Sequence, residues 1–366
     1  MAAAAFAQPA APPHFERGVQ LERAGDFAGA RAAYEQALAI APGRVDALSN
    51  LGAVWLRLGR ASEAAASFRK ALAARPDLLQ IRFFLGLALY QSGQFAPARN
   101  ELGQVLAAQP GEVRALHLDA LCLLKLDRLN EGARLLERVL AAPGAQNAQA
   151  AVTLATTYIS LGELDKAEAL LVGHSSPAVQ LAQGMLLNSR SRHREAEAVL
   201  EAAREADPKL PAVHNQLGYT RMLLGDYAAA IEDFEKELAI GPKDFQATAN
   251  LGWIHVQERN YEKALGFLVE AQRQKPDNAG LAYLMGQVRS SRSEWAAAAS
   301  NLEAAVRKQP DFRAAHVLLA RVYARLNRPA DLAREQALIA RLNEAEQMRN
   351  AASGEGYGTA TQRPPP

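Results

Sequence analysis

The chain has 366 residues, of which 49% are apolar, and 41 Lys and Arg residues nearly balance 39 Asp and Glu residues, giving a formal net charge of +2 at pH 7. The apolar content argues against an intrinsically disordered chain, and the near-neutral charge argues against a nucleic-acid-binding protein that relies on bulk positive charge. No run of about 18 uncharged apolar residues could form a membrane-spanning helix, and the single cysteine, Cys122, excludes an intrachain disulfide framework.

A repeat of about 34 residues runs along the chain and is marked by proline. Seven prolines follow the 34-residue spacing in two runs: Pro42, Pro76 and Pro110, then Pro208, Pro242, Pro276 and Pro310. Pro143 lies one residue early. The pattern gives ten repeats, which begin near residues 11, 45, 79, 113, 148, 177, 211, 245, 279 and 313. Self-similarity of this length predicts a solenoid of stacked helical units.

Small and large residues recur in register when the repeat proline is counted as position 32. Position 8 is Gly or Ala throughout: Gly18, Gly52, Gly86, Ala120, Ala155, Gly184, Gly218, Gly252, Gly286 and Ala320. Position 20 is mostly Ala, and position 24 is large and apolar in nine repeats: Tyr34, Phe68, Leu102, Leu136, Leu171, Leu200, Phe234, Leu268 and Leu302. We expect two helices in each repeat to cross closely where positions 8 and 20 meet, with the large residues filling the space beside the crossing.

The turn signals support this division into helical pairs. Glycine stands at position 15 in five repeats, where the first helix should end, and it adopts the left-handed conformation there without strain. These glycines are Gly25, Gly59, Gly93, Gly162 and Gly225. The proline at position 32 stops the second helix.

These recurring positions resemble the tetratricopeptide repeat family over about residues 11 to 344. The clearest examples are the segments from Asn50 to Asp77 and from Asn215 to Asp244. The resemblance implies an all-α fold, a right-handed superhelical solenoid of about ten helix-turn-helix repeats. It also implies that the first helix of each pair lines a concave face, which in this family usually holds a protein or peptide.

The fifth repeat is irregular, because the step from residue 148 to residue 177 is only 29 residues. Its second helix should be shortened and should end in the turn sequence from Gly173 to Pro177. This irregularity is either a break between two five-repeat halves or an eroded helix without consequence. We expect repeats 1–5 over residues 14–176, repeats 6–10 over 177–344, and the end of the last helix with a disordered tail over 345–366.

The N-terminal tail, residues 1–13, is rich in Ala and Pro and is also expected to be disordered. The residues Ala5, Phe6 and Ala7 match the end of a signal-peptide cleavage site, but no basic start or full apolar stretch precedes them. The tail is therefore either a plain Ala-Pro segment or the remnant of an export signal. The compartment stays open between the cytoplasm and, with an upstream or truncated signal, the periplasm or secretion.

No catalytic, cofactor-binding or metal-binding motif is present. None of the seven histidines forms a pair with metal-ligand spacing, and no glycine-rich phosphate-binding loop occurs. Cys122 lies within a first helix, where a packed thiol is expected. The sequence thus predicts no enzyme, no cofactor and no metal. It also predicts no nucleic-acid partner, because glycine, alanine and proline follow the tetratricopeptide pattern rather than the RNA-reading pentatricopeptide pattern. Two basic stretches, residues 189–194 and the last repeat with Arg313, Arg321, Arg325 and Arg328, are expected to be solvated.

The proposed concave face carries apolar and aromatic side chains at positions 5, 9 and 12 of the first helices. These positions share one helical stripe, and an exposed apolar stripe marks a binding surface. Partial burial between neighbouring first helices is the competing interpretation. The predicted partner-binding groove comprises Phe83, Leu87, Tyr90, Leu121, Tyr219, Met222, Trp253 and Tyr283.

Some members of this family grip the C-terminal tail of a chaperone with a carboxylate clamp. Two asparagines here, Asn50 and Asn250, occupy one clamp position, but the charged donors of the neighbouring repeats are absent. We therefore expect a non-enzymatic scaffold that binds an apolar peptide or helix in its groove. The alternative is a structural subunit of an envelope or secretion complex that packs through its convex face or its ends.

Overall fold

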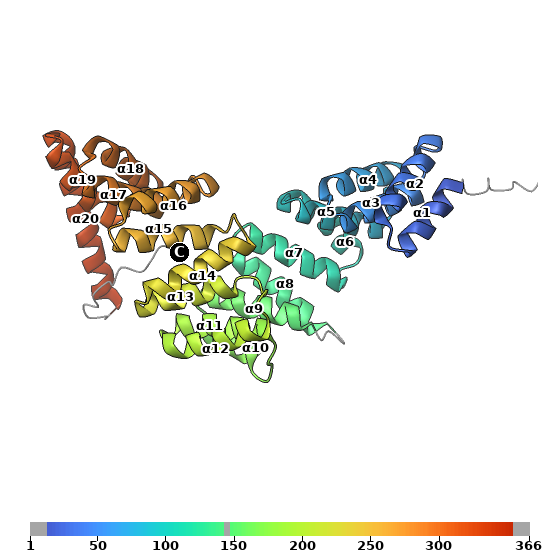
Figure 1. Cartoon of the computed structure of the whole chain (residues 1–366), viewed down its shortest axis with the longest axis horizontal. Coiled ribbons are helices and arrows are strands. Elements are labelled where there is room, and N and C mark those ends of the chain that lie inside the picture. The colour runs from blue at the N-terminus through green and yellow to red at the C-terminus, as the bar shows by residue number, and fades with distance from the viewer. Residues whose placement is uncertain (1–12, 143–146, 354–366) are drawn as a thin grey trace, which may run out of the picture. The chain divides into compact units, whose positions relative to one another are not determined.

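The structure is a computed structural model that describes residues 13–142 and 147–353. Every regular element in these ranges is an α-helix, and there are twenty of them (Figure 1). The helices form ten helix-turn-helix pairs, which confirms the predicted all-α solenoid. The predicted export-signal remnant, Pro143 and the segment 354–366 lie outside the described residues.

The chain divides into two compact units, which part between Gly173 and His174. We call them the N-terminal and the C-terminal unit. The boundary between the two units follows α10. This helix has 8 residues, whereas most second helices, such as α12, have 14. The second helix of the fifth repeat is therefore shortened as predicted, while a hinge at this place stays a prediction.

The N-terminal unit contains the first five pairs. Its first helices are α1 (Pro13–Arg23), α3 (Val45–Arg57), α5 (Leu79–Gln91), α7 (Val113–Lys125) and α9 (Ala148–Leu161). Its second helices are α2 (Phe27–Ile40), α4 (Ala61–Ala74), α6 (Phe95–Ala108), α8 (Leu129–Ala141) and α10 (Leu164–Leu171).

The C-terminal unit contains the other five pairs. Its first helices are α11 (Pro177–Ser189), α13 (Val213–Leu224), α15 (Phe245–Gln257), α17 (Ala279–Ser291) and α19 (Arg313–Arg325). Its second helices are α12 (His193–Ala206), α14 (Tyr227–Ile240), α16 (Tyr261–Gln274), α18 (Trp295–Lys308) and α20 (Pro329–Ser353).

The two helices of a repeat are joined where the glycine at position 8 meets the large residue at position 24. A β-carbon added at Gly52 would lie 2.5 Å from a ring carbon of Phe68, and one at Gly184 would lie 2.4 Å from Cγ of Leu200. The nearest atoms thus belong to position 24, whereas we expected the alanine of position 20. Glycine is needed because the bulky side chain packs directly on the backbone of the first helix.

The turn between the paired helices has the same backbone in all ten repeats. The five glycines at position 15 have φ between +71° and +83°, as predicted. The other five repeats reach the same left-handed region with other residues: Asp127, Ser191, Arg259, Ser293 and Asn327, at φ between +54° and +61°. The geometry of the turn is therefore conserved along the chain where its glycine is not.

Buried cores run between the helices of each unit. In the N-terminal unit one cluster joins repeats 2 to 4 around Phe68, Leu89 and Leu102, which are at most 1% exposed. In the C-terminal unit Phe234, Leu251 and Ile254 are fully buried at the junction of repeats 7 and 8. Among the described residues, no helix is long and apolar enough to cross a membrane.

Candidate functional site

Successive first helices contact one another within each unit. In the N-terminal unit α3 contacts α5 and α5 contacts α7, and in the C-terminal unit contacts run from α11 through α13, α15 and α17 to α19. No contact of comparable extent joins successive second helices in the described part of the chain. The first helices are therefore the closer set, which places them on the inner side of the curvature of each unit.

Four predicted groove residues lie together in the N-terminal unit, on α5 and α7. Phe83, Leu87, Tyr90 and Leu121 form what we call the N-terminal stripe, and all four are half-buried. Phe83, Leu87 and Tyr90 pack against the core of repeats 2 to 4. The stripe therefore has its inner edges fixed by the core and leaves part of each side chain accessible.

Aromatic neighbours hold two residues of this stripe. The ring of Phe83 lies 5.6 Å from that of Phe84 in an edge-to-face arrangement, and the ring of Tyr90 lies 5.6 Å from that of Phe95. The guanidinium of Arg114 lies 5.0 Å from the Phe83 ring centroid, within the range of a cation–π contact.

An open pocket adjoins the stripe at the beginning of α3 and α5. Its volume is about 630 Å³. One wall contains Phe84, the ring partner of Phe83, and the opposite wall contains Ser49 and Asn50 of the preceding repeat. Its full lining is Val45, Asp46, Ser49, Asn50, Leu78, Gln80, Ile81 and Phe84. The pocket combines apolar walls with a few polar side chains, as peptide-binding surfaces commonly do.

Three predicted residues form a second stripe in the C-terminal unit. Tyr219 on α13, Trp253 on α15 and Tyr283 on α17 make up the C-terminal stripe, and each is half-buried. Tyr219 and Trp253 pack against one core cluster, and Trp253 and Tyr283 pack against the next. Because α13 contacts α15 and α15 contacts α17, the stripe runs from one first helix to the next.

The stripe residues are braced from behind. The Trp253 ring lies 6.0 Å from that of Tyr227 at 83°, and the Tyr283 ring lies 5.0 Å from that of Phe312. Burial raises the pKa of the Tyr283 phenol, while the positive charge of Arg321 opposes that rise. The phenol is therefore neutral at physiological pH and can donate a hydrogen bond.

Met222 does not belong to either accessible stripe. Its side chain is only 3% exposed and packs in the core with Phe234 and Ile254. The helical spacing placed it beside Tyr219, but neighbouring repeats close over position 12 here. We therefore count Met222 as a core residue and leave it out of the candidate site.

Comparison with known families settles what kind of chain this is. One sequence model described as tetratricopeptide repeat matches residues 15–78, 181–245 and 283–342, which together make up more than half of the chain. Two further models with the same description match residues 56–122, 221–288 and 148–172. The chain belongs to the tetratricopeptide repeat family.

Three solved structures resemble this one in fold. A tetratricopeptide repeat protein from Parabacteroides merdae ATCC 43184 is 16% identical, with a TM-score of 0.58 over 67% of this chain and 98% of that one. The APC/C hetero-tetramer Cut9-Hcn1 is 18% identical, with a TM-score of 0.59 over 80% of this chain and 59% of that one. Human IFIT1, solved as a dimer with PPP-AAAA, is 15% identical, with a TM-score of 0.58 over 89% of each chain.

One curated relative matches part of the tetratricopeptide repeat region. The Drosophila melanogaster protein described as "BBSome complex member BBS4 homolog" is 24% identical over 147 residues. The match covers 38% of this chain and 30% of the relative, so this chain spans less than a third of that protein's length.

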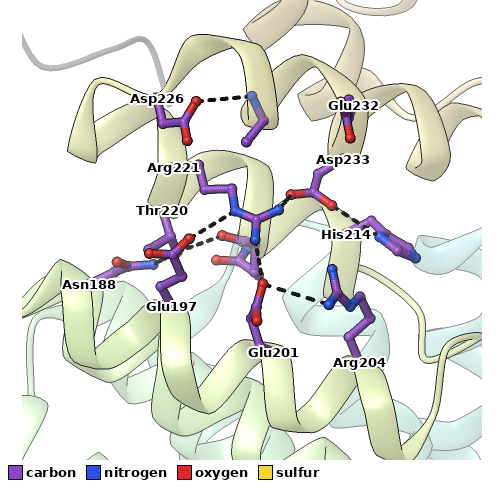
Figure 2. Close-up of polar contacts among 12 residues, drawn as sticks. Asn188, Glu197, Glu201, Arg204, His214, Thr220, Arg221, Asp226, Glu232 and Asp233 are labelled. Carbon is purple, nitrogen blue, oxygen red and sulfur yellow. Dashed lines mark hydrogen bonds and ion pairs between the residues drawn. The ribbon is translucent and has the colours of Figure 1, made fainter.

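A partly buried polar cluster between repeats 6 and 7 was not predicted (Figure 2). The Arg221 side chain of α13 donates to three carboxylates: to Glu197 with Nε–Oε1 2.9 Å, to Glu201, and to Asp233 with Nη1–Oδ2 2.6 Å. Burial alone would lower the pKa of this guanidinium, but the hydrogen bond to Glu197 and the charge of Asp233 raise it above its usual value. The Asp233 side chain is fully buried and pairs with Arg221 within repeat 7, and the bonds from Arg221 to Glu197 and Glu201 join this pair to repeat 6.

This cluster is one case of a contact that recurs between repeats. Position 11 of one repeat binds the glutamate at position 25 of the repeat before it. Tyr158 donates to Glu137 in this way, Tyr323 donates to Glu303 at 2.8 Å, and Arg221 donates to Glu201. A polar residue at position 11 paired with glutamate 20 or 21 residues earlier is the sequence signal that could have revealed it.

The groups that could carry chemistry are used in packing. Cys122 is 0% exposed, and burial raises the pKa of its thiol to about 12, so the thiol stays protonated. His255 and His316 contact carboxylates of Glu258 and Glu335, at 3.1 and 2.6 Å. Within the described residues no group of three or more His, Cys, Asp or Glu side chains could hold a metal ion.

Proposed function

We propose that this tetratricopeptide repeat protein is a non-enzymatic scaffold whose first-helix faces bind an apolar segment, extended or helical, of a partner protein. The observation that carries the proposal is the C-terminal stripe, where Tyr219, Trp253 and Tyr283 follow one another on successive helices and stay half-exposed. Aromatic side chains with a braced inner edge lose little freedom on binding, and they dominate interface energies.

The N-terminal stripe supports the same proposal independently. Phe83, Leu87, Tyr90 and Leu121 are half-buried, and the ring of Phe83 contacts Phe84, which lines the neighbouring pocket. We propose that each unit offers its own binding face. A partner segment bound to either face would bury apolar surface at about 25 cal/mol per Å², before the cost of ordering the segment.

We also propose that the partner is a protein and neither a nucleic acid nor a chaperone C-terminal tail. The net charge of +2 supports the first exclusion. The second is supported by the two clamp-like asparagines, since Nδ2 of Asn50 donates to the Tyr34 hydroxyl at 3.2 Å and Asn250 is only 6% exposed.

The test compares what the full chain captures with and without the stripes. Extracts of the source cells are passed over the wild-type chain and over a variant with Phe83, Tyr90, Tyr219 and Trp253 changed to Ala, and the bound proteins are quantified by mass spectrometry. A partner of the first-helix faces is retained by the wild type and lost by the variant. Trp253→Ala and Tyr219→Ala are each expected to weaken binding of that partner by about tenfold or more.

The matched control is Trp295→Ala. Trp295 is also a half-buried tryptophan, but it lies at the start of the second helix α18. Circular dichroism melting is recorded for every variant. If Trp253→Ala unfolds its unit, or if Trp295→Ala weakens capture as much as Trp253→Ala does, the face is not the binding site.

A structural subunit of a larger assembly is the second candidate function. It is favoured by Ile40 and Ile240, which occupy the same position of second helices and are 64% and 53% exposed. Partners of such a subunit would be captured equally by the four-alanine variant and would be lost from an Ile40→Glu and Ile240→Glu variant.

A further inference from the structure

The C-terminal stripe ends at a positive charge. The first helices of the C-terminal unit present twenty residues at positions 2, 5, 9 and 12, and among them Arg321 on α19 is the one charged side chain. This isolated charge beside the aromatic row is a marked departure from the rest of that face.

Three neighbouring arginines of the last repeat have partners within the protein. Arg313 donates to Asn343 at 2.6 Å, Arg325 lies over the Trp295 ring at 5.8 Å, and Arg328 bonds Asp331 at 2.7 Å. Arg321 is exposed, and no carboxylate of the described residues lies within ion-pair distance of it. A guanidinium left over where its neighbours are all engaged is available to an external anion.

Arg321 is placed at the end of the aromatic row. Its helix α19 contacts α17, and its charge acts on the phenol of Tyr283, the last aromatic of the C-terminal stripe. Tyr283 in turn shares a core cluster with Trp253. A segment lying across Tyr219, Trp253 and Tyr283 would therefore reach the guanidinium of Arg321 at one end.

We propose that the C-terminal stripe binds a peptide segment in which an acidic side chain stands beside a run of apolar or aromatic residues, and that Arg321 pairs with that carboxylate. This inference rests on the proposed function and specifies the chemistry of its partner. The bound segment would shield Arg321 from water, and a guanidinium so shielded requires a complementary charge, a carboxylate, to accept its hydrogen bonds.

The carboxylate comes from an Asp or Glu side chain and not from a chain terminus. A terminal carboxylate is gripped by several converging donors, whereas here Arg325, one turn along α19 from Arg321, lies over the Trp295 ring. The neighbouring first-helix positions carry Gln287, Val317 and Ala324, which supply no second positive charge.

The test uses the full chain and a phage-displayed library of random 16-residue peptides. Selection is carried out on the wild type, on Arg321→Glu, and on Arg307→Glu as the matched control. Arg307 is an exposed arginine at the end of the second helix α18, away from the stripe, so its charge reversal changes the net charge equally. Peptides selected on the wild type and on Arg307→Glu are expected to combine apolar residues with Asp or Glu, and those selected on Arg321→Glu to combine them with Lys or Arg.

A selected peptide then serves as the probe in fluorescence anisotropy. Changing its acidic residue to the amide is expected to weaken binding to the wild type about tenfold and to strengthen binding to Arg321→Glu, where the acidic residue faces a like charge. Amidating its C-terminus is expected to leave the affinity unchanged. If amidation lowered the affinity and the side-chain change did not, the carboxylate would be the terminal one and the assignment would be wrong.

The two proposals fail in different ways. If selected peptides lose affinity with Trp253→Ala but carry no acidic preference, the stripe is a binding face and the role of Arg321 is wrong. If no selected peptide responds to Trp253→Ala, the binding face itself is wrong, and the inference about Arg321 falls with it.

Discussion

The carboxylate of Asp233 accepts a hydrogen bond from Nη1 of Arg221 at 2.6 Å although the Asp233 side chain has no exposed surface. The two residues lie on paired helices, α13 and α14, of repeat 7. Because the same guanidinium also bonds Glu197 and Glu201 of repeat 6, this pair anchors one repeat to the next.

Removing Arg221 should therefore destabilise the C-terminal unit strongly. Arg221→Met leaves the buried Asp233 with only the His214 ring beside it, Nδ1–Oδ1 3.5 Å, and we expect a loss of about 3 to 5 kcal/mol. The control is Arg273→Met, which breaks an exposed pair with Glu270 and should cost less than about 1 kcal/mol. Urea unfolding followed by circular dichroism measures both, and equal effects would mean that the cluster contributes nothing beyond a surface ion pair.

Two glycine substitutions should have effects of opposite sign. Gly184→Ala places a methyl group 2.4 Å from Leu200 and should destabilise by about 1 to 3 kcal/mol. Gly103→Ala lies in α6 with no atom near its new methyl group, so it should stabilise by about 0.5 to 1 kcal/mol. Melting temperatures test the pair, and a stabilising Gly184→Ala would contradict the close approach of positions 8 and 24.

The turns of the repeats predict a second pair of substitutions. Arg259 has φ +58°, in the left-handed region. This conformation costs most residues about 1 kcal/mol, while Gly, Asn and Asp adopt it more readily. Arg259→Gly should thus stabilise by up to about 1 kcal/mol, while Gly225→Ala, at φ +83°, should destabilise by a similar amount. Thermal melting of the two variants would refute the argument if their shifts had the same sign.

Stability should fall at alkaline pH. Burial, together with the bond to Glu137, raises the pKa of Tyr158 to about 12 from its usual 10.0. Because this pKa is higher in the folded chain than in the unfolded chain, the stabilisation is complete below about pH 10 and is lost as the pH rises toward 12. Burial raises the pKa of Cys122 from 9.0 to about 12 as well, so its share is lost from about pH 9 upward.

Tyr158→Phe isolates the contribution of Tyr158 to this dependence. The variant keeps the ring but has no proton to lose, so its melting temperature should decline less steeply than that of the wild type between pH 10 and 12. Parallel declines would show that Tyr158 titrates normally in the folded chain.

The periodicity of the sequence was sufficient to predict the helical pairs, because small residues at position 8 and proline at position 32 act locally. It also predicted which first-helix residues line a groove, and of these Tyr219 and Trp253 are half-buried, while their role in binding stays a prediction. It could not predict the burial of Met222, since that depends on how closely the next repeat stacks over position 12.

The polar contacts between repeats, such as those of Arg221, could not be predicted for a different reason. Arg221 and its three carboxylates come from three helices, and each looks like an ordinary charged residue on a solvated face. Only the stacking of the helices brings them together and excludes water. The left-handed turns without glycine, such as that at Arg259, escaped because tertiary packing imposes a backbone that the residue itself disfavours.

Because these polar contacts differ from one junction between repeats to the next, the repeats are not interchangeable. Deleting or duplicating one 34-residue repeat changes the interfaces on both sides of it. The stability of the product therefore depends on which junction is cut. A cut between repeats 6 and 7 separates Arg221 from Glu197 and Glu201 and leaves ionic groups without their counterparts. A chimeric protein built from this chain should therefore keep repeats 6 and 7 together.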